Sequence, residues 1–220
     1  MDNRKYAFTL AEVLITLVIV GVIAALTIPT LMKNMHNHEY VAALKKTYAA
    51  LSQATQLIIS ENGSPKGDSS WLTDMDSIYD MYKKHLINAK DCGEGACEGD
   101  DKYYLTYLNG TKVGTNWFGV TRSHRKLILS DGAFLIFEST DKTCSINNYV
   151  GNGSKDVCAK IYADVNGAKK PNQHGRDIFG FVLKANGLYP AGCDYPSNCD
   201  VKHIGFDCAC KVLRENAINY

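Results

Sequence analysis

Residues 5–32 read KYAFTLAEVLITLVIVGVIAALTIPTLM, and this stretch decides the architecture of the chain. From Val13 to Met32 it contains no charged side chain and is mainly apolar. At 1.5 Å per residue this length of helix spans about 30 Å, the thickness of the hydrocarbon core of a bilayer. Because a helix in a globular core is rarely apolar on all sides over this length, the stretch predicts a membrane span at about residues 13–32. A cleaved signal peptide is the alternative, but its apolar core is shorter and no A-x-A site follows this run.

The apolar pattern continues beyond the span as one stripe. Apolar or weakly polar residues recur at spacings of three and four, as on one face of a helix: Val41, Leu44, Tyr48, Leu51, Thr55 and Ile58. Gly63 and Pro65 then supply a stop signal. The pattern predicts a single helix over residues 8–62 that is bent or locally opened at Pro29.

Residues 63–220 are polar and rich in turn signals. The pairs Asn109-Gly110, Asp131-Gly132 and Asn186-Gly187 separate strand-like runs and favour hairpins with two-residue turns. Residues 72–88 have the pattern of a short helix. We therefore expect an α+β fold, in which the outer half of the long helix packs on a small antiparallel β-sheet domain of residues 63–220.

The eight cysteines all follow residue 91 and indicate a disulfide-rich outer domain. No pair has the C-x2-C spacing of a zinc or thioredoxin-like site, so disulfides formed in an oxidising compartment are favoured over reduced thiols. Spacing suggests local bonds within two pairs, Cys92 with Cys97 and Cys144 with Cys158. Cys208 and Cys210 would share a face if extended, so we expect them to bond elsewhere, with Cys193 and Cys199 as candidates.

The N-terminal residues carry a family resemblance. A short basic leader, the stretch Ala7-Phe8-Thr9-Leu10-Ala11-Glu12 and the apolar run with its proline together resemble the prepilin signal of type IV pilins and of type II secretion and competence pseudopilins. The resemblance covers roughly residues 1–62 and implies a pilin-like fold. It also implies that a prepilin peptidase and methyltransferase removes the leader, residues 1–7, and methylates the new amine of Phe8. The family usually has glycine before the cut, whereas this chain has Ala7.

The resemblance gives Glu12 and Pro29 roles in assembly. Glu12 matches the family's acid near the start of the mature chain, and Pro29 matches its helix-kinking proline. An intramembrane carboxylate is costly unless it is paired, so Glu12 of one subunit would bind the Phe8 amine of a neighbour in a filament. In the alternative reading, Glu12 reaches the lipid headgroups or serves recognition by the peptidase.

Two outer segments contain candidate binding residues. The first offers oxygen ligands for calcium around a Gly-containing loop, from Asp164, Asn166, Asn172 and Asp177, in a pattern that departs from the EF-hand. A tight turn that uses the same side chains on its own backbone is the alternative. The second segment is basic, with Arg122, His124, Arg125 and Lys126, but the net charge of +1 argues against nucleic acid as a partner.

No motif for an enzyme is found, and calcium is the one cofactor that the pattern allows. The sequence thus predicts a structural subunit of a type IV pilus or type II secretion-like pseudopilus, assembled with other pilin subunits. The basic leader places the N-terminus in the cytoplasm, with one pass through the bacterial inner membrane and the outer domain in the periplasm or in a cell-surface filament. Two alternatives stay open: a membrane-anchored binding or adhesion domain, and a DNA-uptake pseudopilin.

Overall fold

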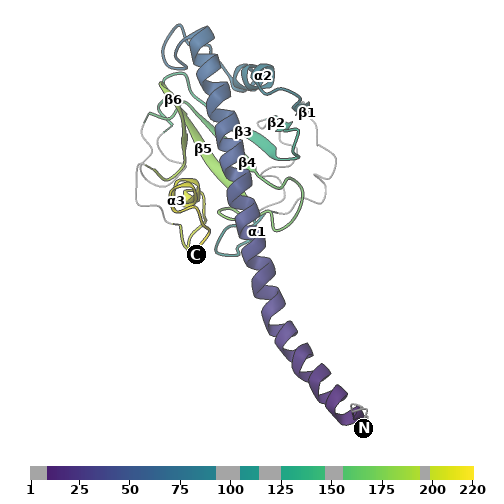
Figure 1. Cartoon of the computed structure of the whole chain (residues 1–220). Helices are drawn as coiled ribbons and strands as arrows, with labels where there is room; N and C mark the ends of the chain where they lie inside the picture. Colours follow the sequence, from purple (N-terminus) through teal and green to yellow (C-terminus); the bar gives the residue numbers. More distant parts are fainter. Residues whose placement is uncertain (1–8, 93–104, 114–124, 147–155, 194–198) are drawn as a thin grey trace. The chain divides into compact units, whose positions relative to one another are not determined.

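The computed structural model describes residues 9–92, 105–113, 125–146, 156–193 and 199–220 (Figure 1). The chain divides into two compact units, Met1–His38 and Glu39–Tyr220. One helix, α1 (Leu10–Asn62), contributes residues to both units. It ends where the sequence predicts, since Gly63 adopts a positive φ of 82° that most other residues avoid.

In the first unit α1 is exposed on all sides. None of the described residues 9–38 is buried, and the helix continues through Pro29. By length and composition this helix could cross a membrane: its most apolar 18-residue window has a mean hydropathy of 2.6 and is 0% buried. Such a surface is stable only in lipid or against other protein.

The second unit is built on an antiparallel sheet. In the described part of the chain the sheet has six strands in sequence order, each paired with the next. The strands are β1 (Lys90–Asp91), β2 (Arg125–Ile128), β3 (Phe134–Thr140), β4 (Ala159–Asp164), β5 (Ile178–Lys184) and β6 (Gly187–Pro190). The expectation of an α+β fold with a small antiparallel sheet is confirmed.

The main core lies between one face of this sheet and the helices. The predicted stripe of α1 is buried there, except for Tyr48, which is half-buried and stacks on Phe181 of β5 at 5.7 Å. Helix α2 (Met75–His85) adds Ile78 and Tyr82 to the same core, and Tyr82 forms a 2.5 Å hydrogen bond with Thr55 of α1. The alternation of the strands thus buries one set of side chains against the helices.

The opposite face of the sheet has its own, smaller core. Phe134, Ile136 and Tyr162 point to this side and pack with Leu105 and Phe206 from loop segments. Both faces of β4 are therefore buried, which explains why the burial of this strand does not alternate. The sequence analysis did not identify β4, because a strand buried on both faces lacks the two-residue period.

The hairpin loops differ from the predicted two-residue turns. Between β2 and β3, the Leu129 N–H donates to the Ala133 oxygen at 2.8 Å, so three residues form the loop and Gly132 takes a φ of 89°. The Asn109-Gly110 loop is built the same way. A three-residue loop with glycine in last position suits the twist of paired strands, and this alternative was missed.

The third hairpin is shifted by one residue. Lys184 pairs with Gly187, so the two-residue turn between β5 and β6 consists of Ala185 and Asn186. Gly187 begins β6 at a φ of 153°, the position after a type I turn where glycine is favoured.

Helix α2 lies within the segment predicted to be helical, but it is shorter. It begins after Asp74, whose carboxylate accepts the Ser77 N–H at 2.8 Å, while the Ser77 hydroxyl accepts the Asp74 N–H at 3.1 Å. This reciprocal cap fixes the start of the helix three residues later than the sequence suggested.

A third helix, α3 (Cys208–Glu215), was not predicted. Cys208 and Cys210 lie in the first turn of α3 and not in an extended segment, and each bonds a cysteine outside the helix. Ala209 and Val212 of this helix are buried in the main core. Helix α3 has only eight residues, two of them cysteines, so too few apolar residues remain to show a helical period.

Candidate assembly site

Glu12 takes part in the cap of α1. Its Oε2 atom accepts hydrogen bonds from the Thr9 N–H at 2.8 Å and from the Thr9 hydroxyl at 2.7 Å. In return the Glu12 N–H donates to the Thr9 hydroxyl at 3.3 Å. Thr9 and Glu12 thus form a capping box, which satisfies main-chain groups that the first turn of a helix leaves open.

The capping box was missed in the sequence, although its signal was present. Thr9-x-x-Glu12 directly before an apolar run is the spacing that defines such a cap. All hydrogen bonds described for this carboxylate go to Oε2, and among the described residues none goes to Oε1. The carboxylate can therefore hold its own helix end and still offer one oxygen to another group.

The other residues of the predicted signal are placed differently. Ala7 and Phe8, the predicted cleavage and methylation site, lie outside the described residues. Pro29 is inside α1, in the exposed unit. The roles predicted for these three residues stay predictions.

Three disulfides are described in the outer domain. Cys144 bonds Cys158, as the spacing suggested. The other two cross-links join a loop to α3, Cys193 with Cys210 and Cys199 with Cys208. These pairs use the partners considered for the two C-terminal cysteines. The suggested bond of Cys92 with Cys97 lies outside the described residues, because Cys97 is not among them.

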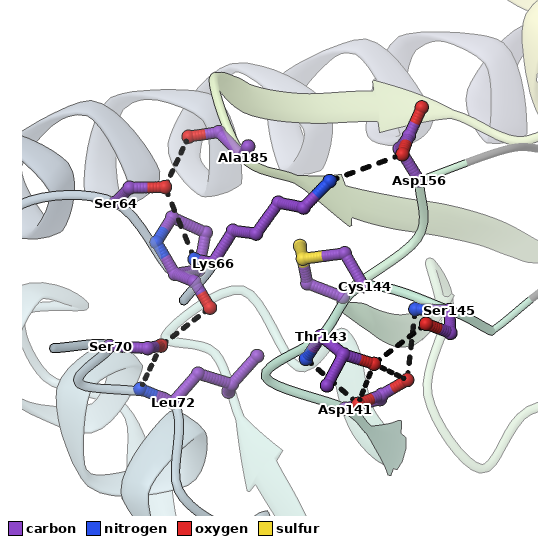
Figure 2. Close-up of a disulfide and its surroundings, with 12 residues drawn as sticks. Ser64, Lys66, Ser70, Leu72, Asp141, Thr143, Cys144, Ser145, Asp156 and Ala185 are labelled. Atoms are coloured by element: carbon purple, nitrogen blue, oxygen red, sulfur yellow. Dashed lines mark hydrogen bonds and ion pairs between the residues drawn. A yellow bond between two sulfur atoms is a disulfide. The ribbon is translucent and has the colours of Figure 1, made fainter. Parts of the chain in front are cut away.

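The segment that follows α1 is tied to several parts of the outer domain. The Ser64 hydroxyl donates to the Ala185 oxygen at 3.3 Å, and Lys66 forms an ion pair with Asp156 at 3.3 Å, near the Cys144–Cys158 disulfide (Figure 2). The Gly67 N–H also donates to the Lys142 oxygen at 2.9 Å. The end of α1 is thereby attached to both sides of the disulfide.

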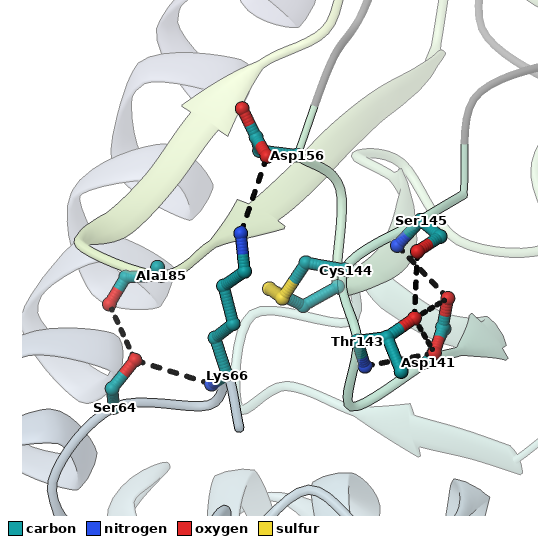
Figure 3. Close-up of polar contacts among 9 residues, drawn as sticks. Ser64, Lys66, Asp141, Thr143, Cys144, Ser145, Asp156 and Ala185 are labelled. Atoms are coloured by element: carbon teal, nitrogen blue, oxygen red, sulfur yellow. Dashed lines mark hydrogen bonds and ion pairs between the residues drawn. A yellow bond between two sulfur atoms is a disulfide. The ribbon is translucent and has the colours of Figure 1, made fainter.

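A second polar cluster supports the turn beside this disulfide (Figure 3). The Asp141 carboxylate accepts the N–H groups of Thr143 and Ser145, both at 2.9 Å, and the Thr143 hydroxyl at 2.8 Å. These hydrogen bonds, chiefly those from Thr143, lower the pKa of Asp141. Asp141 therefore has a local structural role.

The four predicted calcium ligands gather where β4 leads into β5. Asp164 ends β4, and Asp177 precedes β5 with its carboxylate accepting the N–H groups of Asn172 at 2.8 Å and Gln173 at 2.6 Å. The Asp164 carboxylate accepts the Asn166 N–H at 3.2 Å. Both carboxylates thus make the loop contacts expected of a tight turn.

The same loop also has oxygen atoms of the kind that calcium binds. The side-chain oxygens of Asn166 and Asn172 are buried and have no hydrogen-bond partner among the described residues. They lie beside Asp177, whose pKa is raised by burial to about 6. Buried polar atoms of this kind fit a cation, which would also offset the cost of burying the carboxylate. Among the described residues, no group of three or more His, Cys, Asp or Glu side chains is arranged to hold a metal ion.

The predicted basic cluster is used in part for internal contacts. Arg125 forms an ion pair with Asp76 of α2 at 2.5 Å, and Lys126 is buried with its amine 5.0 Å from the centre of the Phe134 ring. Arg122 and His124 lie outside the described residues. The two described members therefore do not form an open phosphate-binding surface.

Comparison with known proteins identifies two matching families. A model of the prokaryotic N-terminal methylation motif matches residues 2–28, which include Ala7, Phe8 and Glu12. A model described as a family of unknown function (DUF6613) matches residues 30–194, more than half of the chain. The chain belongs to this family. No curated protein and no solved structure matches the chain.

The methylation motif identifies the N-terminal segment as a prepilin signal of the type IV pilin and pseudopilin kind. The chain is thus a pilin-like or pseudopilin subunit in general terms. Its long apolar helix agrees with a membrane-anchored protein. The second match groups the outer domain with related sequences and assigns it no activity.

Proposed function

We propose that this chain is a structural subunit of a type IV pilus or of a type II secretion-like pseudopilus. The observation that carries the proposal is the methylation motif at the head of a helix whose apolar half is exposed on all sides. A helix of this kind is stable in a membrane and again in a bundle of identical helices. The role is mechanical, and the proposal assigns the chain no catalytic activity.

The proposed path begins in the inner membrane. The N-terminus faces the cytoplasm and the outer domain faces the periplasm, where disulfides form. A prepilin peptidase cuts between Ala7 and Phe8, the Phe8 amine is methylated, and the subunit enters a filament with other pilin subunits. Calcium bound beside Asp164 and Asp177 would stabilise the outer domain in this scheme.

The capping box supports a specific role for Glu12. Because Thr9 donates two hydrogen bonds to Oε2, the carboxylate has a defined position at the start of its own helix, and Oε1 is left to bind another group. In a filament, the Phe8 amine of a neighbouring subunit would bind this second oxygen. A subunit in the wrong register would leave the carboxylate without a counter-charge in an apolar bundle, which is costly.

Mass spectrometry of filaments sheared from cells tests the proposal. We expect the mature chain to begin at N-methylated Phe8, and the Glu12→Gln variant to be cut at the same bond but absent from the sheared fraction. Glutamine keeps the shape of the side chain and removes its charge. A chain in the sheared fraction that still begins at Met1, or Glu12→Gln filaments at the wild-type yield, would contradict the proposal.

A further inference from the structure

The outer unit has a groove that is separate from the assembly site at Glu12. It encloses about 270 Å³ where α1 passes the C-terminal end of α2 and the turn between β2 and β3. This volume is below the range of about 300–1,000 Å³ that is typical of small-molecule sites. The groove is therefore suited to a few protein side chains.

The lining of the groove is mainly apolar and includes two exposed aliphatic side chains. Ala50 and Ala54 of α1 contribute small side chains, as at sites where a second helix can approach closely. Leu57 and Ile87 flank them and are 44% and 84% exposed. Leu57 and Ile87 thus present apolar surface beside the groove, which a protein partner would remove from water.

The charge of the groove matches an uncharged partner. Its lining includes Lys46 and Asp131, which form an ion pair at 2.9 Å and so neutralise each other. The chain itself contains an uncharged, exposed apolar helix, residues 13–32 of α1. An apolar helix entering the groove would leave no charge without a partner.

Continuity along α1 points to the same partner. Ala50, Ala54 and Leu57 lie on the helix that carries the exposed apolar half, about three to five turns after the start of the outer unit. Neighbouring helices that cover the apolar half of one subunit would therefore continue along the same helix into its groove. Gly21 and Ala25, one turn apart, allow such helices a close approach.

We infer that the groove lined by Ala50, Ala54, Leu57 and Ile87 receives side chains from the uncharged apolar half of α1, residues 13–32, of a second copy of this chain. The inference rests on the proposed filament and adds the surface that one outer domain offers to the helix of its neighbour. Groove and helix are different surfaces, so the contact is head-to-tail and propagates into a fibre rather than closing into a dimer.

Photo-crosslinking in cells tests the contact directly. A photoreactive amino acid is placed at position 87 of the full chain, and, as a control, at position 201, where Val201 is 54% exposed but does not line the groove. We expect irradiated filaments to contain dimers in which position 87 is linked to a residue between positions 13 and 32 of the second chain. Links from position 87 to other peptides, or no link in assembled filaments, would overturn the inference.

A matched pair of variants separates this inference from the proposed function. Ile87→Glu places a charge against the incoming helix and should lower the yield of sheared filaments by about tenfold or more, whereas Val201→Glu should leave it within about twofold. Both side chains are exposed, so neither change should alter the melting temperature appreciably. If Ile87→Glu assembles as well as Val201→Glu, the groove contact is wrong and the filament proposal stands. If the unmodified chain forms no filament, both are wrong.

Discussion

Asp207 provides a test of the electrostatics of the outer domain. It precedes α3 and is only 8% exposed, and its carboxylate oxygen Oδ1 is buried with no hydrogen-bond partner in the described part of the chain. Burial raises the pKa of this carboxyl from 3.8 to about 6. Well below pH 3.8 the group is neutral in the folded and the unfolded chain, and the burial has no electrostatic cost. As the pH rises through 6, the buried group must ionise and that stability is lost.

The size of the effect follows from the two pKa values. A difference between 3.8 and about 6 corresponds to at most about 3 kcal/mol of unfolding free energy. Because the carboxyl keeps some contact with solvent, we expect about 1–2 kcal/mol. Asp207→Asn removes the ionisable group and should raise the melting temperature at pH 8 by about 3–6 °C.

The assay is thermal unfolding of the full chain in detergent micelles, followed by circular dichroism at pH 8 and pH 4.5. The gain of Asp207→Asn over the wild type should be fully present at pH 8 and reduced to about a third at pH 4.5. Asp200→Asn is the control, since this exposed carboxylate accepts the Lys202 N–H at 2.8 Å and its pKa is lowered. It should give no gain at pH 8. The reasoning is refuted if Asp207→Asn changes stability equally at both pH values, or lowers it at pH 8.

Three further predictions concern the core, a disulfide and calcium. Tyr82→Phe should lower the unfolding free energy by about 1 kcal/mol. Because the Tyr82 and Thr55 hydroxyls bond each other, Thr55→Val should cost less in the Tyr82→Phe background than in the wild type, and additive losses in urea titrations would contradict this. Replacing Cys144 and Cys158 by serine should cost about 3 kcal/mol in non-reducing buffer, and an unchanged urea midpoint would contradict it. Calcium at a hundred times its dissociation constant should stabilise the chain by about 2.7 kcal/mol, an effect lost in Asp164→Asn; no rise in melting temperature with millimolar calcium would rule the site out.

The sequence allowed good predictions where a strong periodic signal was present. The stripe from Val41 to Ile58 is long enough for its spacing to identify both the helix and the face that meets the sheet. Gly63 marks the end of that helix because few other residues adopt its positive φ. The exposed half of α1 was predicted from composition alone, because the run before the stripe has no charged residue.

Local signals were weaker where tertiary packing decides the result. Strand β4 is buried on both faces and shows no alternation, and α3 is too short for its periodicity to stand out beside two disulfide-bonded cysteines. The Asp131-Gly132 pair predicted a hairpin but could not determine the length of its loop, because glycine at positive φ fits both two-residue and three-residue loops. At the candidate site, the position of Glu12 at the edge of an apolar run predicted a role for its charge. The capping box that it forms with Thr9 was not predicted, although the Thr9-x-x-Glu12 spacing is typical of one.

The way α1 is held by the outer unit has a mechanical consequence. Its buried stripe, Val41 to Ile58, covers about 26 Å of helix and belongs to the main core over that length. A pull along the helix axis therefore loads these contacts together, in shear, instead of opening them one after another from an end. The chain that follows is held beside the Cys144–Cys158 bond by hydrogen bonds and an ion pair, so slippage of the helix would also have to break these contacts. The subunit is built to bear tension along α1.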